Sequence, residues 1–453
     1  MGDLSEKYRS LRSRLASIQH PILWILVIGI AIRLLASTLS VVYDADYWAL
    51  VIRNIEAGEG LYGVEGYYYT PVWGYILGLV SAFQSIFLDL GYDVVRVVEL
   101  LFSEAVPFVY FSATVPSVAF TFTVNLPLII SDVILAFGVR YLAKDATGDD
   151  HKADLAFAMV FLCPLLIGIT CITGMPDTFA ATFLVLTVIL LKRDRYFVAG
   201  MMFSLAVLTK FFPVFVIFPL IVYVILKASD RKAAVFNLSY AVMGAVGMTL
   251  IIFIPQILDG TLEQCFQFLT DRTGSSVESN LFDIIAGKAR IIMYVAVIIA
   301  SILCAVHMYR SGKDRSDHNM MRFCFLLLAM CMLYPPAPQY MISMLPFLVY
   351  WAVVEDGKCA LSWKIISFAS IFFITTSNAL LLLPLAAWTN LISVDTVAGL
   401  LQWFSAGGGF TPGLVWMVFG GVMTYIGIVS IFLIMFRDRM PFKRRGIVGQ
   451  DSD

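Results

Sequence analysis

Acidic residues and one lysine at the ends of long apolar runs are the residues best suited to chemistry in this sequence. Asp44 and Asp46 come directly after the first apolar run, next to aromatic residues. Asp177 lies in a short turn between two later runs, and Lys210 follows another. A placed carboxylate acts as a general base, and a lysine stabilises a phosphate or another anion. Each also has an ordinary explanation, because helix-end acids are commonly solvated and a lysine near a membrane surface extends its charge into water.

Other polar residues interrupt the apolar runs. They are Tyr47, Tyr69, Arg272, Glu278, Gln339 and Tyr340. Two opposite charges, Arg33 and Asp132, fall inside apolar runs instead. Because an unpaired charge in lipid is costly, we expect these two to form a structural ion pair.

The composition shows which elements must position these side chains. Of the 453 residues, 60% are hydrophobic and 14% are charged, whereas soluble domains have about 45–50% apolar and about 25% charged residues. This excludes an ordinary soluble enzyme, a disordered protein and a nucleic-acid binder with an exposed basic face. The net charge of −1 indicates nothing by itself.

We therefore predict an all-α integral membrane protein, because a helix satisfies its backbone hydrogen bonds within lipid. Its first apolar run is long enough to cross the roughly 30 Å of hydrocarbon and is expected to be a retained helix. The sequence favours about 12 spanning helices, within a range of 11–14. The expected helices are 22–42, 122–142, 155–172, 178–191, 197–209, 213–227, 235–256, 290–308, 322–336, 341–354, 362–386 and 412–436.

The positive charges predict how these helices are oriented. With the N-terminus in the cytoplasm, 24 of the 31 Lys and Arg residues fall on cytoplasmic connections and their flanks, as the positive-inside rule requires. All four histidines then lie on the cytoplasmic side, so acid–base chemistry at the outer face rests on carboxylates. The seven cysteines include no Cys-x-x-Cys pair, and most are expected to be small buried side chains.

Three long connections are expected on the outer side, at 43–121, 257–289 and 387–411. The first contains an amphipathic stretch and a second apolar run, 72–88. We expect both to be amphipathic interfacial helices at the outer membrane surface. In the alternative, 72–88 spans the membrane together with 102–121, which gives fourteen helices.

Several motifs follow one another along the chain. In the first outer loop they are Asp44-Ala45-Asp46-Tyr47, Leu61-Tyr62 and Tyr68-Tyr69-Thr70-Pro71. Further along they are Asp177, the run from Gly200 through Ala206-Val207 and Lys210 to Pro213, Arg272 with Glu278-Ser279, and Gln339-Tyr340 followed by Leu345-Pro346. This order resembles the C-type (GT-C) polytopic glycosyltransferases. The resemblance is closest to the enzyme that adds the first mannose to glycosylphosphatidylinositol and to its prokaryotic relatives that use polyprenyl-phosphate mannose. The His-Asn pair of the eukaryotic enzyme is missing from the later loop.

The resemblance implies a membrane enzyme that transfers a sugar, expected to be mannose, from a polyprenyl- or dolichyl-phosphate donor to a lipid-linked or glycolipid acceptor. It implies an inverting displacement on the extracytoplasmic face, with Asp44 or Asp46 as the base and Asp177 as a supporting acid. Lys210 and Arg272 are then expected to bind the donor phosphate.

The remaining polar residues are expected to contact the substrates. They are Tyr47, Tyr69, Glu278, Gln339 and Tyr340. We expect no cofactor and no metal, although two acids and a phosphate are also suitable ligands for Mg²⁺ or Mn²⁺. The expected partners are the lipid-phosphate donor, the acceptor and membrane lipid, and not nucleic acid.

The resemblance also divides the chain. The expected parts are a cytoplasmic N-terminal segment 1–21, a catalytic module 22–256, an outer loop 257–289, a C-terminal transmembrane module 290–436 and a basic cytoplasmic tail 437–453. We expect a multi-pass protein of a prokaryotic plasma membrane, or of the endoplasmic reticulum membrane if the source is eukaryotic.

Two other functional classes remain open from the residues alone. A transporter or lipid flippase uses intramembrane charges to line a substrate path, and a structural subunit of a membrane complex needs no chemistry. The long first outer loop and the absence of a detectable internal repeat favour the enzyme over a transporter.

Overall fold

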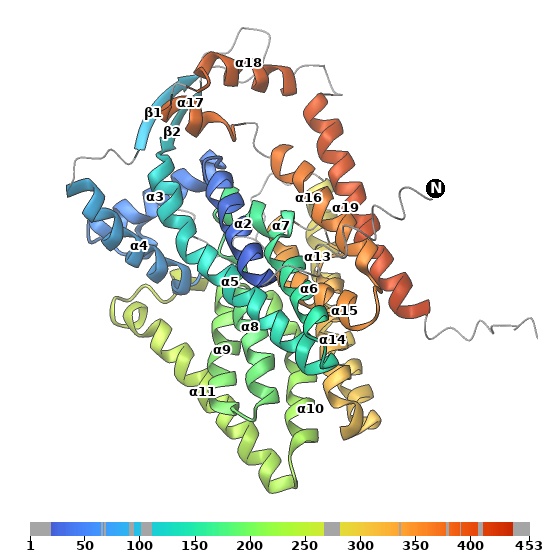
Figure 1. Cartoon of the computed structure of the whole chain (residues 1–453). Coiled ribbons are helices and arrows are strands. Elements are labelled where there is room, and N and C mark those ends of the chain that lie inside the picture. The colour runs from blue at the N-terminus through green and yellow to red at the C-terminus, as the bar shows by residue number, and fades with distance from the viewer. Residues whose placement is uncertain are drawn as a thin grey trace, which may run out of the picture.

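The computed structural model is largely helical (Figure 1). It describes residues 20–64, 67, 69–89, 95–100, 111–266, 281–334, 337–376, 380–389, 391–405 and 411–437. The α-helices are α2 (Pro21–Ala36), α3 (Val42–Glu56), α4 (Pro71–Asp89), α5 (Val118–Thr147), α6 (Asp150–Phe161), α7 (Pro164–Ile167), α8 (Asp177–Lys192), α9 (Tyr196–Thr209), α10 (Ile217–Lys227), α11 (Arg231–Leu258), α13 (Leu281–Ser311), α14 (Ser316–Cys331), α15 (Leu345–Val354), α16 (Ala360–Thr376), α17 (Leu383–Trp388), α18 (Val394–Ser405) and α19 (Pro412–Arg437). Short 3₁₀ helices lie at Leu61–Gly63, Phe212–Val216, Gln264–Phe266, Lys313–Arg315 and Pro338–Ser343, and one π-helical turn lies at Gly168–Ile172.

Several helices are suited to a membrane by length and composition. Within the described ranges, five are long and apolar enough to cross one: Val118–Thr147, Asp150–Ile172, Arg231–Leu258, Ile291–Ser311 and Pro412–Phe436. Shorter apolar helices lie at Pro21–Ala36, Tyr196–Thr209, Phe212–Lys227, Leu345–Val354 and Ala360–Phe372. The chain is therefore an integral membrane protein, while the count of about twelve spans stays a prediction.

The first predicted helix, 22–42, is wrong in its C-terminal part. Helix α2 ends at Ala36 with Ser37 as its C-cap, and α3 begins at Val42. Serine and threonine hydroxyls bond nearby backbone and so compete with helical hydrogen bonds; Thr38 donates such a bond to a carbonyl of the last turn. The break places Asp44 in the first turn of a new helix instead of in a loop.

The first long connection also contains a β-hairpin, which corrects the all-α expectation. Strands β1 (Val95–Leu100) and β2 (Phe111–Pro116) pair antiparallel, with Val95 opposite Pro116. Alternating valines in β1 have the high strand propensity of β-branched residues. Because β2 occupies part of 102–121, this stretch does not form the extra spanning helix of the fourteen-helix alternative.

The hairpin, α17 and α18 form a cap at the end of the bundle where α3 lies. Figure 1 shows these elements together, with the connection between α10 and α11 at the opposite end. Strand β2 contacts α3 and α17, and β1 contacts α18. The cap has a small apolar core of its own, separate from the main core, made of Val42, Val115, Leu380, Leu383 and Val397.

Two glycines allow α9 and α11 to pack at unusually short range. A Cβ atom on Gly200 would lie 1.9 Å from the carbonyl oxygen of Ala241, and one on Gly244 would lie 1.9 Å from that of Phe197. Small residues are enriched where membrane helices approach closely. Gly200, the first residue of the run that ends in Lys210 and Pro213, therefore serves helix packing.

Candidate active site around Lys210

Helix α3 separates the two acids of the Asp-x-Asp pair. Asp44 and Asp46 are two residues apart within α3, and residues at this spacing point to different faces of a helix. The positive charge of Lys210 acts on Asp44, whereas that of Arg53 acts on Asp46. Of the two acids, Asp44 is therefore the one that belongs with Lys210.

Trp48 fixes the face of α3 that carries Asp44, because it lies one helical turn further along. Its indole Nε1 donates a 3.1 Å hydrogen bond to the carbonyl of Gly174. The buried ring also packs edge-on against Tyr69, with centroids 5.5 Å apart. Gly174 begins the turn that leads to Asp177, so Trp48 ties α3 to the second acidic segment. Sequence reasoning missed Trp48, although its spacing of four from Asp44 was a usable signal.

Lys210 lies at the break between α9 and the next 3₁₀ helix. It is the first residue after α9 and has an extended backbone, with φ −148° and ψ 139°. Pro213 is the second residue of the 3₁₀ helix Phe212–Val216, a position in the first turn at which its missing N–H removes no helical hydrogen bond. The hydroxyl of Thr70 donates to the carbonyl of Leu208 in the last turn of α9. Thr70, the residue before α4, thus bonds the end of α9 that presents Lys210.

The ammonium group of Lys210 is surrounded by an acid and two tyrosines. Its Nζ lies 3.3 Å from Oδ2 of Asp177, 4.8 Å from the centre of the Tyr69 ring and 5.4 Å from that of Tyr340. Cation–π contacts contribute about 0.5–2 kcal/mol each. The side chain is 13% exposed. Burial alone lowers the pKa of Lys210, but the negative charge of Asp177 outweighs this, and the pKa lies above the ordinary value. Lys210 is therefore a cation at neutral pH.

Asp177 lies beneath Lys210, away from solvent. It is the first residue of α8, where the helix dipole favours a negative charge. The side chain is 0% exposed, and neither carboxylate oxygen has a hydrogen-bond partner of good geometry among the described residues. A carboxylate enclosed in this way does not touch a substrate in this conformation. Asp177 therefore acts on the site through the position and charge of Lys210.

Asp44 is partly buried, and this changes its acidity. Burial raises the pKa of Asp44 to about 6, and the positive charge of Lys210 opposes this rise. A carboxyl group with this pKa is mostly ionised at pH 7 and is a stronger base than a solvated aspartate. Burial also raises the pKa of Asp46, opposed by Arg53.

The structure brings five predicted residues together, which we call the Lys210 cluster: Asp44, Tyr69, Asp177, Lys210 and Tyr340. The ring of Phe212 closes one side of it, packed 4.9 Å from the ring of Tyr340. Sequence reasoning missed Phe212, which it treated as part of an apolar run.

The other predicted residues lie beside the cluster or outside the described chain. The half-buried ring of Tyr47 packs 5.6 Å from that of Trp48. Gln339 is half-buried next to Tyr340. Arg272 and Glu278 lie outside the described residues, so their roles stay predictions.

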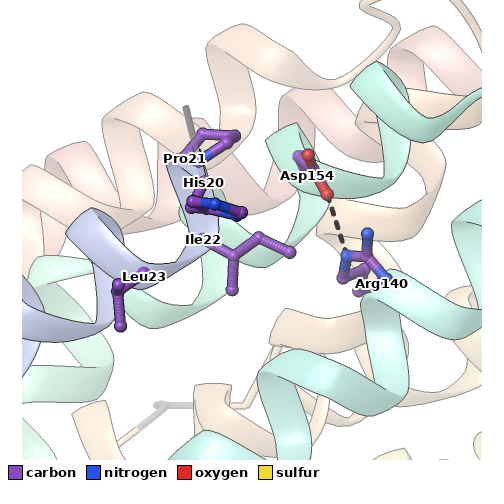
Figure 2. A pocket seen from close by; sticks show the side chains of 6 residues that line it. All are labelled: His20, Pro21, Ile22, Leu23, Arg140 and Asp154. Atoms are coloured by element: carbon purple, nitrogen blue, oxygen red, sulfur yellow. Dashed lines mark hydrogen bonds and ion pairs between the residues drawn. The ribbon is translucent and has the colours of Figure 1, made fainter. Parts of the chain in front are cut away.

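A separate groove of about 540 Å³ lies near the start of α2, away from the Lys210 cluster. It is lined by His20, Pro21, Ile22, Leu23, Arg140 and Asp154 (Figure 2). Arg140 Nε donates a 2.8 Å hydrogen bond to Oδ1 of Asp154, and Figure 2 shows the two side chains facing one another. Because the cation in this groove already has a carboxylate partner, the groove is a weaker candidate for binding an anionic substrate.

The described part of the chain holds no group of three or more His, Cys, Asp or Glu side chains that could bind a metal ion. The two acids of α3 face different surroundings and do not form a joint ligand pair. Metal dependence stays open, because the loop that contains Glu278 is not described.

The geometry agrees with a comparison of the sequence with protein families. No curated protein matched the chain. A family model described as glycosyltransferase family 87 matches residues 105–335, a stretch that contains Asp177 and Lys210. Asp44 and Tyr69 precede it, and Tyr340 follows it. The match does not test the narrower likeness to the first-mannose enzyme. Because it covers just over half of the 453 residues, the chain belongs to glycosyltransferase family 87, a GT-C-like polytopic family.

Proposed function

We propose that this glycosyltransferase transfers mannose from a polyprenyl- or dolichyl-phosphate donor to a lipid-linked or glycolipid acceptor. The observation that carries the proposal is the Lys210 cluster, in which Nζ of Lys210 lies 3.3 Å from Asp177 beside two tyrosine rings and its positive charge acts on Asp44. A base and a cation at one place suit an acceptor hydroxyl and a donor phosphate. The choice of mannose rests on the motif resemblance. The proposed site faces the extracytoplasmic side, as the distribution of Lys and Arg predicts.

The proposed reaction is a single displacement that inverts the anomeric carbon. The acceptor oxygen bonds to this carbon while the bond from the carbon to the phosphate oxygen breaks. The phosphate leaves with the bonding electron pair, and the acceptor proton passes to the Asp44 carboxylate. We favour Asp44 over Asp46 as the base, because Lys210 acts on Asp44 and Arg53 acts on Asp46.

Lys210 is proposed to bind the donor phosphate. Negative charge builds on the phosphate as the glycosidic bond breaks, so a cation stabilises the transition state more than the ground state. Asp177 and the two tyrosines hold the ammonium group in place before the donor arrives. Such pre-arrangement reduces the reorganisation needed during the reaction.

The decisive experiment is a sugar-transfer assay with purified protein in nanodiscs. The donor is synthetic short-chain polyprenyl-phosphate mannose, and a matched polyprenyl-phosphate glucose tests the choice of sugar. A panel of lipid acceptors is offered, and the anomeric configuration of the product is determined. We expect transfer of mannose with inversion. Transfer from a nucleotide sugar alone would contradict the proposed donor class, and retention would contradict the single displacement.

The family assignment favours this enzyme over a transporter or lipid flippase. The same nanodisc preparation separates the two classes, because net sugar transfer needs no second compartment. Reconstituted protein that moves the lipid-phosphate sugar across vesicles but forms no product would support the transporter instead.

A further inference from the structure

We propose that a buried network centred on Asp132 positions the Lys210 cluster, an inference that rests on the proposed function. The network consists of Arg33 on α2, Asp132 on α5, Thr170 in the π-helical turn and Thr178 on α8. All four are positioning residues, since each acts on the reaction through other residues.

Asp132 connects three separate chain segments. Its Oδ2 accepts hydrogen bonds from Arg33 Nε at 2.9 Å and from the Thr170 hydroxyl at 3.0 Å. Its Oδ1 accepts a 2.8 Å hydrogen bond from the Thr178 hydroxyl. Arg33 also lies over the Phe161 ring at 4.0 Å. Both side chains are 0% exposed. Both oxygens of Asp132 accept hydrogen bonds, while Arg33 Nη2 lies 2.8 Å from Oδ2 as an ion pair without a hydrogen bond of good geometry.

Thr178 is the residue through which this network reaches the site. It follows Asp177 directly in the first turn of α8. The hydrogen bond from Thr178 to Asp132 fixes how the first turn of α8 is rotated and where it lies along the helix axis. It thereby fixes the position of the Asp177 carboxylate next to Lys210. Thr170 lies in a π-helical turn, a feature common at functional sites.

Hydrogen bonds beside this network connect it to the segment between α2 and α3. The backbone N–H of Val41 donates a 2.9 Å hydrogen bond to the carbonyl of Ile172, two residues after Thr170. Asn125 Nδ2 donates to the carbonyl of Cys171 at 2.8 Å and to the Ser37 hydroxyl at 3.2 Å. The segment that precedes Asp44 and the segment that precedes Asp177 are thus bonded to each other. The network therefore sets the position of the proposed base, Asp44, relative to the cation, Lys210.

The test compares two isosteric changes in α8. Thr178→Val removes the hydrogen bond to Asp132. Thr182→Val is the matched control, because Thr182 lies one turn further along and bonds Ser131 instead. We expect Thr178→Val to lower kcat on the order of tenfold per folded protein, because small displacements of catalytic groups reduce rates strongly. Thr178→Ser keeps the hydroxyl and should retain most of the rate, and Thr182→Val should match wild type. Equal kcat for Thr178→Val and Thr182→Val would overturn the inference.

A double-mutant cycle with Lys210→Met shows whether Thr178 acts through the cluster. If it does, Thr178→Val has no further effect on kcat in the Lys210→Met background. Equal slowing in both backgrounds would overturn the inference and leave the proposed function intact. Wild-type turnover in Lys210→Met alone would instead overturn the proposed role of Lys210, and the inference with it.

Discussion

The molecule contains two buried pairs of opposite charge that differ in how fully they are satisfied. In the Arg33–Asp132 pair both side chains are 0% exposed, the charges approach to 2.8 Å, and two threonines complete the acid's hydrogen bonds. In the Lys210–Asp177 pair the charges lie 3.3 Å apart, the lysine is 13% exposed, and the acid has no partner of good hydrogen-bond geometry among the described residues.

This difference separates a pair that stabilises the fold from a pair that can bind a ligand. Both oxygens of Asp132 are hydrogen-bonded to the protein and have no capacity left for a ligand, whereas the Lys210–Asp177 pair lacks such bonds within the described part of the chain and keeps capacity for one. In the sequence, Arg33 and Asp132 fall inside apolar runs, whereas Asp177 and Lys210 lie at the ends of such runs. Their surroundings distinguish them, and the four predictions below test that distinction.

The largest expected effect is on stability. Arg33→Met leaves the Asp132 carboxylate buried without its cation, and removing one partner of a buried pair typically costs about 3–5 kcal/mol. The double change Arg33→Met/Asp132→Leu removes both charges and should recover most of this loss. Thermal unfolding in detergent measures both. Equal destabilisation by Arg33→Met and Lys210→Met would erase the contrast between the pairs.

The next effect is on turnover. Lys210→Met should lower kcat by about 10²–10³-fold per folded protein, the usual effect of removing a group that stabilises transition-state charge. Its unfolding temperature should fall less than that of Arg33→Met, because the Lys210–Asp177 pair is longer and its lysine is 13% exposed. Lys210→Arg keeps the charge but not the shape, so partial activity is expected. Donor titrations separate kcat from KM. Unchanged kinetics for Lys210→Met would remove Lys210 from the site and leave Arg272 as the candidate phosphate ligand.

The two acids of α3 should differ in their effect on rate. Asp44→Asn should reduce kcat by about 10²-fold or more, as expected for a positioned base. Asp46→Asn is the matched control on the same helix and should have a much smaller effect. Transfer rates at saturating donor and acceptor provide the measurement. A larger loss from Asp46→Asn would exchange the proposed roles.

The smallest effect is a shift in pH dependence. Because the base must be ionised, kcat should fall below about pH 6, where Asp44 becomes protonated. Lys210 lowers the pKa of Asp44, so the residual activity of Lys210→Met should be lost at a higher pH than that of wild type. An unshifted acidic limb in Lys210→Met would argue that the two charges do not interact.

The sequence was sufficient for some of the helices and for one of the pairs. The pair of Arg33 with Asp132 is confirmed, because the cost of a lone charge in lipid leaves few alternatives. The predicted helix 178–191 differs from the observed Asp177–Lys192 by one residue at each end. The length of the apolar run and the turn residues beside it indicate where such a helix begins and ends.

Features that depend on tertiary contacts were missed. The break after Ala36 was missed because apolar residues at Leu39, Val41 and Val42 follow the polar Ser37 and Thr38 and extend the apparent run. The hairpin was missed because Phe111–Pro116 falls within the apolar stretch 102–121, and an apolar run alone does not distinguish a strand from a helix. The separation of Asp44 from Asp46 follows from their place in a helix, and hydropathy does not distinguish a helix from a loop at that point.

The close contact between α9 and α11 has a consequence for genetic screens. A side chain at Gly200 or Gly244 would collide with the backbone of the facing helix, and α9 ends at Lys210. A screen that scores only product formation would therefore rank substitutions at both glycines with those of the reacting residues. Measuring protein abundance alongside product would separate them, since a collision between helices reduces the amount of protein, whereas a conservative change of a reacting residue such as Asp44→Asn leaves it in place.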